Sequence, residues 1–140
     1  MRFSSSVLLV SLAAMACVAP TTSAAPKLVA REGWCEDSTF INASSGGSPQ
    51  IVDCQQLAAN IVGSGNWFLT ASDRTIAQYG TCAFNARVES SGIQITHIGN
   101  DDVRDIIRDS IAKFAWQGKV GSGGHMNCDG VGVTWGLFHA

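Results

Sequence analysis

The cysteines constrain this chain more than any other feature of its sequence. It has five of them in 140 residues, and Cys17 lies in an apolar run over residues 7–19. A positively charged start precedes this run, and the small residues Thr22 and Ala24 follow it. This order is typical of a secretory signal peptide, which we place at residues 1–24. The run is too short for a membrane-spanning helix, which needs about 20 residues, and no later segment is long and apolar enough to span a bilayer.

Removal of the signal peptide would leave four cysteines, an even number, in an oxidising compartment. We therefore expect two disulfides, for which three pairings are possible. Zinc sites usually bring cysteines two to four positions apart, whereas these are 19, 28 and 46 positions apart. The spacing therefore disfavours a metal site, although His125 lies near the last cysteine. The four cysteines are Cys35, Cys54, Cys82 and Cys128.

Composition and charge disfavour a disordered chain and a nucleic-acid partner. The formal net charge is −2, and charged residues make up 14% of the chain against 46% hydrophobic residues. Few charges and many apolar residues are the reverse of a disordered composition. A nucleic-acid-binding protein usually presents a basic face, which this balance does not predict. We expect one folded domain without a nucleic-acid partner.

The first half of the mature chain predicts a helix followed by strands. Ser48 suits an N-cap and Pro49 the first helical position, and we expect Gly63 and Gly65 to end the helix. Residues 75–88 alternate as a strand. We expect a turn at residues 90–92, after which Ile93 and Ile95 would continue as the second strand of a hairpin. The inward face of the helix would carry Ile51, Cys54, Ala58 and Ile61.

A second helix is predicted from Asp101 to near Gly118. Acidic side chains crowd its start, which suits the helix dipole better than the spaced ligands of a calcium loop. The glycines of residues 120–124 lack the Lys-Ser/Thr pair of a phosphate-binding loop, so we expect a bend there. Asp129–Gly130 predicts a tight turn, and the alternation of residues 131–137 predicts a final strand. The fold class is α+β, with an antiparallel sheet of four or five strands and two helices on one face.

No residue pattern indicates catalysis. His97, His125 and His139 lie outside any recognisable motif. Glu36 and Asp37 stand beside Trp34 and could suit a site that cleaves sugars with two carboxylates, but we expect a solvated loop. The sequence therefore predicts no enzyme, no catalytic residue, no cofactor and no metal.

Four tryptophans and one sequon complete the candidate sites. We expect Trp135 in the core. The core is also the expectation for Trp34, Trp67 and Trp116, although Trp67 or Trp116 exposed to solvent would suit a partner. Asn42 begins the sequence Asn-Ala-Ser, which is an acceptor for N-glycosylation.

An ordered series of motifs resembles a known family. It is similar to the secreted fungal effectors typified by extracellular protein two, whose domain is named for the induction of necrosis. The resemblance covers about Cys35 to Phe138, and no cysteine departs from it. The motifs are residues 53–57 (DCQQL), 79–84 (YGTCAF), 98–103 (IGNDDV), 106–111 (IIRDSI), 124–128 (GHMNC) and 133–136 (VTWG).

The resemblance implies a secreted, extracellular virulence factor that induces host cell death by binding an unidentified target, without enzyme activity and as a monomer. It divides the chain into a signal peptide at 1–24, a lead-in at 25–34 and an effector domain at 35–138. The order of elements is also similar to the α/β-sandwich killer toxins of fungi. By that analogy Cys35 would pair with Cys128 and Cys54 with Cys82. The alternative functions are a toxin that acts on competing cells and a minor wall-directed hydrolase.

Overall fold

The computed structural model describes residues 33–90 and 92–140. The predicted signal peptide at 1–24, with Cys17, lies outside the described residues, as do Ser91 and all but the last two residues of the predicted lead-in. No helix within the described ranges is long and apolar enough to cross a membrane.

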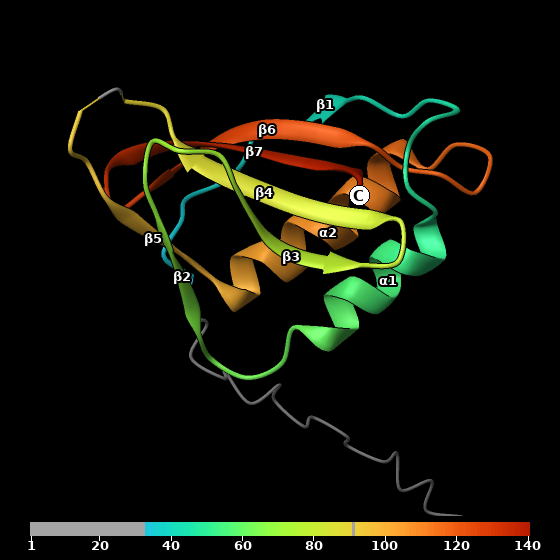
Figure 1. Ribbon diagram of the computed structural model, residues 1–140, viewed down its shortest axis with the longest axis horizontal. Coiled ribbons are helices and arrows are strands. Elements are labelled where there is room, and N and C mark those ends of the chain that lie inside the picture. The colour runs from blue at the N-terminus through green and yellow to red at the C-terminus, as the bar shows by residue number, and fades with distance from the viewer. Residues whose placement is uncertain (1–32, 91) are drawn as a thin grey trace, which may run out of the picture.

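The described chain forms two antiparallel sheets and two helices (Figure 1). A five-stranded sheet has the order β1-β6-β7-β4-β3, and a two-stranded sheet pairs β2 with β5. Both helices lie on the same side of the five-stranded sheet in Figure 1, so the predicted α+β class is confirmed. The elements are β1 (Ile41–Asn42), α1 (Ile51–Asn60), β2 (Asn66–Leu69), β3 (Arg74–Tyr79), β4 (Cys82–Val88), β5 (Thr96–Gly99), α2 (Asn100–Phe114), β6 (Ser122–Cys128) and β7 (Val131–His139).

The core lies between the large sheet and the helices. Alternate residues of β7 point inward, so that Val133, Trp135 and Leu137 are buried as predicted. The ring of Trp135 stacks on that of Phe84 from β4, with centroids 5.9 Å apart. On the helical side, Ile107 of α2 is fully buried. Packing of large apolar side chains from every layer supplies the main stabilisation of the domain.

The turn between β6 and β7 has the predicted chemistry. Asp129 and Gly130 both have positive φ angles, 51° and 76°. Two residues with positive φ match the right-handed twist of the flanking strands. The two strands then pair in register from Cys128 opposite Val131 to Ser122 opposite Leu137.

The start of α2 confirms that its acidic residues cap the helix. An Asp102 carboxylate oxygen accepts the backbone N–H of Gly99 at 3.0 Å, so an otherwise unpaired donor of the first turn is satisfied. The helix ends at Phe114, earlier than the predicted stop at Gly118.

The expected N-cap of α1 was wrong. The helix begins at Ile51, and its N-cap residue is Gln50. The backbone N–H of Gln50 donates to the Thr81 hydroxyl at 2.9 Å. Ser48 is buried one turn earlier, where its hydroxyl accepts the N–H of Ser45 at 2.9 Å. A residue from a distant turn thus contacts the helix start, which a local sequence pattern does not reveal.

Residues 75–88 form two strands rather than the predicted one. The chain turns at Gly80, where φ is 53°. A carboxylate oxygen of Asp53 in α1 accepts both the N–H of Thr81, at 2.9 Å, and its hydroxyl, at 2.7 Å. A Cβ at Gly80 would lie 2.6 Å from this carboxyl carbon. The turn is therefore held by the helix packed beneath it.

The predicted hairpin partner of β4 was also wrong. Ile93 and Ile95 are exposed and precede β5, which pairs with β2 through Phe68 opposite His97. Both edges of β4 are already occupied, by β3 and β7. The segment after β4 therefore leaves the large sheet.

The glycines expected to form a bend lie largely in strand β6. Gly124 faces the core, where a Cβ would lie 2.0 Å from the carbonyl oxygen of Thr39 and 2.6 Å from the Trp135 ring. The glycine therefore allows the chain near Thr39 and the indole to approach the strand closely.

The two expected disulfides join distant parts of the chain. Cys54 of α1 pairs with Cys82 of β4, and Cys35 pairs with Cys128 at the end of β6. This is the pairing that the killer-toxin analogy implied. The Cys35–Cys128 bridge spans 93 positions, and the Cys54–Cys82 bridge spans 28. Closing loops of this length stabilises a domain mainly by restricting its unfolded chain.

We predict that Gly124→Ala lowers the free energy of unfolding by about 1–3 kcal/mol, because the new methyl group overpacks the site beside Trp135. Gly46→Ala is the matched control, since nothing lies within 4 Å of a Cβ built there, and its effect should stay within about 0.5 kcal/mol. Urea unfolding of both variants makes the comparison. Equal effects would contradict the close packing of Gly124.

A second prediction concerns Asp53. Hydrogen bonds from the backbone N–H and then the hydroxyl of Thr81 lower the pKa of Asp53 below its ordinary 3.8. A lowered pKa stabilises the fold above the ordinary value, and this contribution is lost as the pH falls through the folded-state pKa. Asp53→Asn should therefore reduce stability at pH 7, and its difference from the parent should shrink towards pH 2 in urea unfolding. A pH-independent difference would contradict this role.

Candidate functional site

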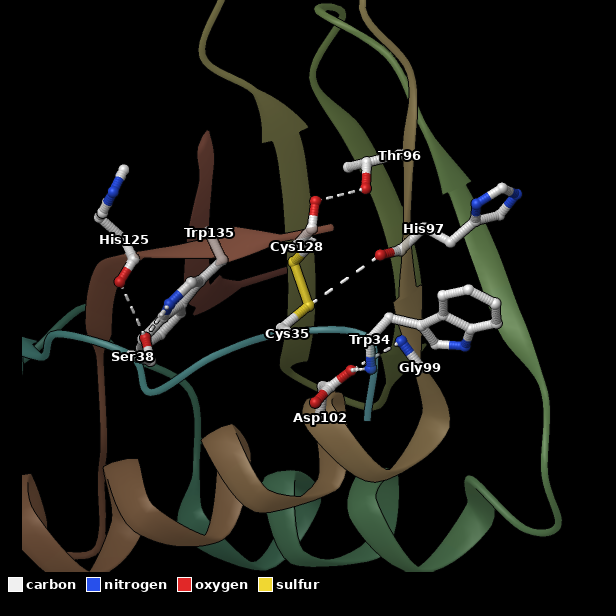
Figure 2. Close-up of a disulfide and its surroundings, with 10 residues drawn as sticks. All are labelled: Trp34, Cys35, Ser38, Thr96, His97, Gly99, Asp102, His125, Cys128 and Trp135. Carbon is white, nitrogen blue, oxygen red and sulfur yellow. Dashed lines mark hydrogen bonds between the residues drawn. A yellow bond between two sulfur atoms is a disulfide. The ribbon is translucent and has the colours of Figure 1, made fainter. Parts of the chain in front are cut away.

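The segment before β1 is held along strand β6 of the large sheet. The Cys35–Cys128 disulfide fixes one point of it, and the N–H of Glu36 donates to the carbonyl of Asn127 at 2.8 Å. Further along, the indole N–H of Trp135 donates to the Ser38 hydroxyl at 2.7 Å. Figure 2 shows Ser38 and Trp135 on one side of the disulfide and Trp34 on the other. The segment is therefore positioned by groups of the sheet and the core.

Helix α2 runs beside this segment and presents carboxylates to it. Asp102, Asp105 and Asp109 follow one another at spacings of three and four residues, which places them on one face of the helix. One oxygen of Asp102 accepts the N–H of Trp34 at 3.0 Å as well as that of Gly99. This carboxylate therefore ties the segment to the start of the helix.

Between the segment and α2 lies a pocket of about 570 Å³, which we call the acidic pocket. Five of its lining residues are carboxylates, and none of the described lining residues is basic. Its apolar wall is formed by Phe40, Ile106 and Met126. Such a pocket favours a ligand with a positive charge and an apolar surface. The carboxylates are Glu36, Asp37, Asp102, Asp105 and Asp109.

Three rings contact one another and form what we call the aromatic shelf. Trp34, Phe68 and His97 make it up, with His97 in the middle. The centroid of the His97 ring is 5.8 Å from that of Trp34 and 5.5 Å from that of Phe68. The side chains of Trp34 and Phe68 are 39% and 44% exposed. Trp34 lies in the chain between Gly33 and Cys35, which line the pocket, but its own side chain belongs to the shelf.

The tryptophans are only partly where the sequence placed them. Trp135 is 2% exposed and belongs to the core as predicted. Trp67 is half-buried against the core, whereas Trp34 and Trp116 are exposed, at 39% and 45%. The expectation of a buried position was wrong for both of these residues. Trp116 lies after α2, where its backbone pairs with that of Lys119.

The structure gives Glu36 and Asp37 a setting that the sequence did not predict. Both are exposed, as expected for a loop, yet both line the acidic pocket opposite the carboxylates of α2. About 65 positions separate the two acidic groups in the chain. The spacing of the acidic residues in α2 indicated an acidic face on this helix. Only the path of the disulfide-bonded segment brings Glu36 and Asp37 to that face.

The histidines lie in three different settings. His97 belongs to the aromatic shelf, and His139 contacts the carbonyl of Ala140 at 2.8 Å. His125 lies 2.6 Å from a carboxylate oxygen of Glu89, which also accepts the Thr134 hydroxyl at 2.7 Å. The hydrogen bonds from Thr134 and then His125 lower the pKa of Glu89. This cluster is exposed, and within the described chain no group of three metal-ligating side chains could hold an ion.

Asn42 is exposed at the end of β1. Its side-chain oxygen accepts the N–H of Ser44 at 2.9 Å. Because β1 pairs only with β6 in the large sheet, its other side is a sheet edge. A glycan here would shield that edge from pairing with another chain.

Comparisons with known proteins place the chain in a family. The family model Hce2, described as "Pathogen effector; putative necrosis-inducing factor", matches residues 34–128. Of two similar proteins of Penicillium expansum, the "Probable chitinase LysM18" is 35% identical over 111 residues, covering 74% of this chain and 8% of that protein. The "Secreted chitinase LysM12" is 39% identical over 75 residues, covering 51% and 5%. The chain thus spans less than a tenth of the length of these relatives.

We predict that Asn42 carries an N-linked glycan when the chain is made in a fungal or yeast secretory pathway. Asn42→Gln should then lose the mass that peptide N-glycosidase removes from the parent. Asn66→Gln, at an exposed asparagine outside any sequon, should keep it. Intact-mass spectrometry measures the mass of the glycan in all three proteins. A parent protein whose mass peptide N-glycosidase does not change would contradict the prediction.

Proposed function

This chain belongs to the Hce2 family of pathogen effectors, and we propose that it is a secreted fungal effector that induces host cell death by binding a target without catalysis. The signal-peptide pattern of residues 1–24 supports secretion. Two disulfides in a domain of this size are typical of extracellular proteins.

The surface at Trp34 carries the proposal. The aromatic shelf and the acidic pocket both draw residues from the same disulfide-bonded segment, and the charged side chains among the described lining residues of the pocket are carboxylates. Aromatic side chains that remain exposed in a folded domain are typical of interaction sites. Charged groups around such rings select the partner and steer its approach.

A binding role suits these carboxylates better than catalysis. Glu36, Asp37 and Asp109 are exposed to solvent. The general acid of a glycoside hydrolase instead lies in an apolar environment that keeps its proton bound near neutral pH. Among the described lining residues no carboxylate is fully buried, so the pocket suits recognition by negative charge better than cleavage by a buried acid.

A wall-directed hydrolase is the second candidate, because both Penicillium expansum relatives are named chitinases and carboxylates face one another in the acidic pocket. The chain matches only 8% and 5% of the length of those relatives. This favours an accessory domain of the chitinases over their catalytic domain. Incubation with colloidal chitin should therefore release no soluble sugar. Release by the parent that Glu36→Gln abolishes would replace the binding proposal with a catalytic one.

We predict that the purified, disulfide-bonded protein causes cell death when infiltrated into leaf tissue of a susceptible host. Trp34→Ala should lose this activity because it removes one end of the aromatic shelf. Trp116→Ala is the matched control, since its indole is equally exposed but lies outside both features. Electrolyte leakage measures the response, and thermal unfolding verifies that both variants are folded.

Full activity of the folded Trp34→Ala variant would contradict the proposal that the surface at Trp34 binds the target. Growth inhibition of other fungi without any leaf response would contradict the host-directed function and favour a toxin against competing cells.

A further inference from the structure

We propose that the Cys35–Cys128 disulfide is a redox switch, in which a small thiol reductant attacks the sulfur of Cys35 and releases the segment before β1. The Cys54–Cys82 disulfide stays closed and keeps the domain folded. The reduction itself does not depend on the proposed function. Its consequence for cell death rests on that function, because the released segment carries Trp34.

The two disulfides differ in their exposure to solvent. Cys54 of α1 and Cys82 of β4 are both 0% exposed and belong to the core. Cys128 is also 0% exposed, but its partner Cys35 is half-buried. An exposed disulfide exchanges with external thiols more readily than a buried one, which is reached only when the domain opens. The Cys35–Cys128 bond is therefore the more accessible of the two.

Cys35 can be reached from the acidic pocket. Among the described lining residues of this cavity of about 570 Å³, Cys35 is the only cysteine. Its neighbours in the chain, Trp34 and Glu36, are exposed. Figure 2 shows the bond running from the segment at Cys35 to β6 at Cys128. A small thiol that enters the cavity therefore meets the sulfur of Cys35 first.

The exchange takes place in two steps. A thiolate of the reductant attacks Sγ of Cys35 and forms a mixed disulfide there, while Cys128 leaves as a thiolate. A second reductant thiolate attacks the reductant's own sulfur in the mixed disulfide, so that Cys35 leaves as a thiolate and the reductant becomes a disulfide. The protein disulfide gains the two electrons that the two reductant thiols lose. The two cysteine thiolates take up the two protons that these thiols release.

The structure has suitable surroundings for both free thiols. The sulfur of Cys35 lies 4.0 Å from the carbonyl oxygen of His97 (Figure 2), which can accept the weak S–H donor of a reduced cysteine. Cys128 lies in the apolar core, where a free cysteine behaves as a small hydrophobic residue. Reduction therefore opens the bond without leaving a strongly polar group unpaired in the core.

After reduction, hydrogen bonds alone hold the segment on β6. The N–H groups of Glu36 and Thr39 donate to the carbonyls of Asn127 and His125, both at 2.8 Å. Each such bond contributes little net stability, because water offers the same groups alternative partners. The segment therefore opens more often in the reduced protein, and Trp34 loses its fixed place in the aromatic shelf. We expect the reduced protein to bind its target more weakly.

The first test follows reduction of the folded mature protein by dithiothreitol at pH 8. Samples are alkylated with iodoacetamide at intervals, and peptide mapping by mass spectrometry identifies the modified cysteines. We expect Cys35 and Cys128 to be alkylated together, at least about tenfold faster than Cys54 and Cys82, which react only through opening of the domain. Equal rates for the two pairs, or faster alkylation of Cys54 and Cys82, would overturn the inference.

A matched pair of variants tests which sulfur is attacked. Cys128→Ala leaves Cys35 as a free thiol, and Cys35→Ala leaves Cys128 free. Because thiol–disulfide exchange is reversible, the accessible sulfur also reacts with an added disulfide. Bis(2-hydroxyethyl) disulfide should add one mercaptoethanol group to Cys128→Ala and none to Cys35→Ala, as measured by intact mass.

Equal modification of both folded variants would contradict attack at Cys35. Circular dichroism verifies that the variants are folded. If either fails to fold, the alkylation rates of the parent protein still test the inference.

Hydrogen exchange measures release of the segment independently of any cell-death activity. When only the Cys35–Cys128 bond is reduced, the amides of residues 35–39 should exchange faster than in the oxidised protein. The amides of β7 should not change, because this strand is held between β4 and β6. Unchanged exchange at residues 35–39 would overturn the switch.

The leaf assay separates this inference from the proposed function. The Cys35→Ala/Cys128→Ala double variant represents the reduced state, and we expect it to cause much less electrolyte leakage than the parent. If the folded double variant keeps full activity and Trp34→Ala loses it, the switch is wrong and the effector site stands. If the parent causes no cell death, the proposed function is wrong, whereas selective alkylation and faster exchange would still support the switch.

Discussion

The Cys35–Cys128 disulfide is the constraint on which the candidate surface depends. It fixes the segment before β1 to the end of β6, and hydrogen bonds then hold that segment along the strand as far as Ser38, which accepts the indole N–H of Trp135. Everything that faces solvent at this end of the domain follows from this path: Trp34 stands beside His97, and the segment forms one wall of the acidic pocket. Without the bridge, that wall would be held by hydrogen bonds alone.

The motifs that carry the family resemblance serve mostly to build the fold. Asp53 and Thr81 join α1 to the turn at Gly80, and Gly124 makes room for Trp135. Several residues of the candidate surface lie outside those motifs, among them Trp34, Glu36, Asp37 and Phe68. A domain built in this way can keep one scaffold while the exposed side chains beside its disulfide determine what it binds. Asp102 and Asp109 belong to both the motifs and the pocket, whereas the aromatic groups and the carboxylates of the disulfide-bonded segment lie outside the motifs.

Sequence reasoning was right where local periodicity and turn chemistry decide structure. The acidic start of α2, the alternation of β7 and the positive-φ turn at Asp129–Gly130 are all local patterns. Sequence reasoning was wrong where a contact with a residue far away in the chain determines the local structure. β5 leaves the large sheet because both edges of β4 are occupied, and Gly80 ends a strand because Asp53 holds the turn. The pairing of strands and the contact of a helix with a turn depend on residues that no local window contains.

By itself, the sequence determined an α+β domain with two disulfides and little charge, because cysteine number, apolar spacing and composition act residue by residue. Only the tertiary structure decided that Glu36 and Asp37 face the acidic side of α2, and that Trp34, His97 and Phe68 share one exposed shelf. The physical reason is the same in both cases. These groups come from segments far apart in the chain, and they meet because a disulfide, a buried indole and a helix start hold those segments together.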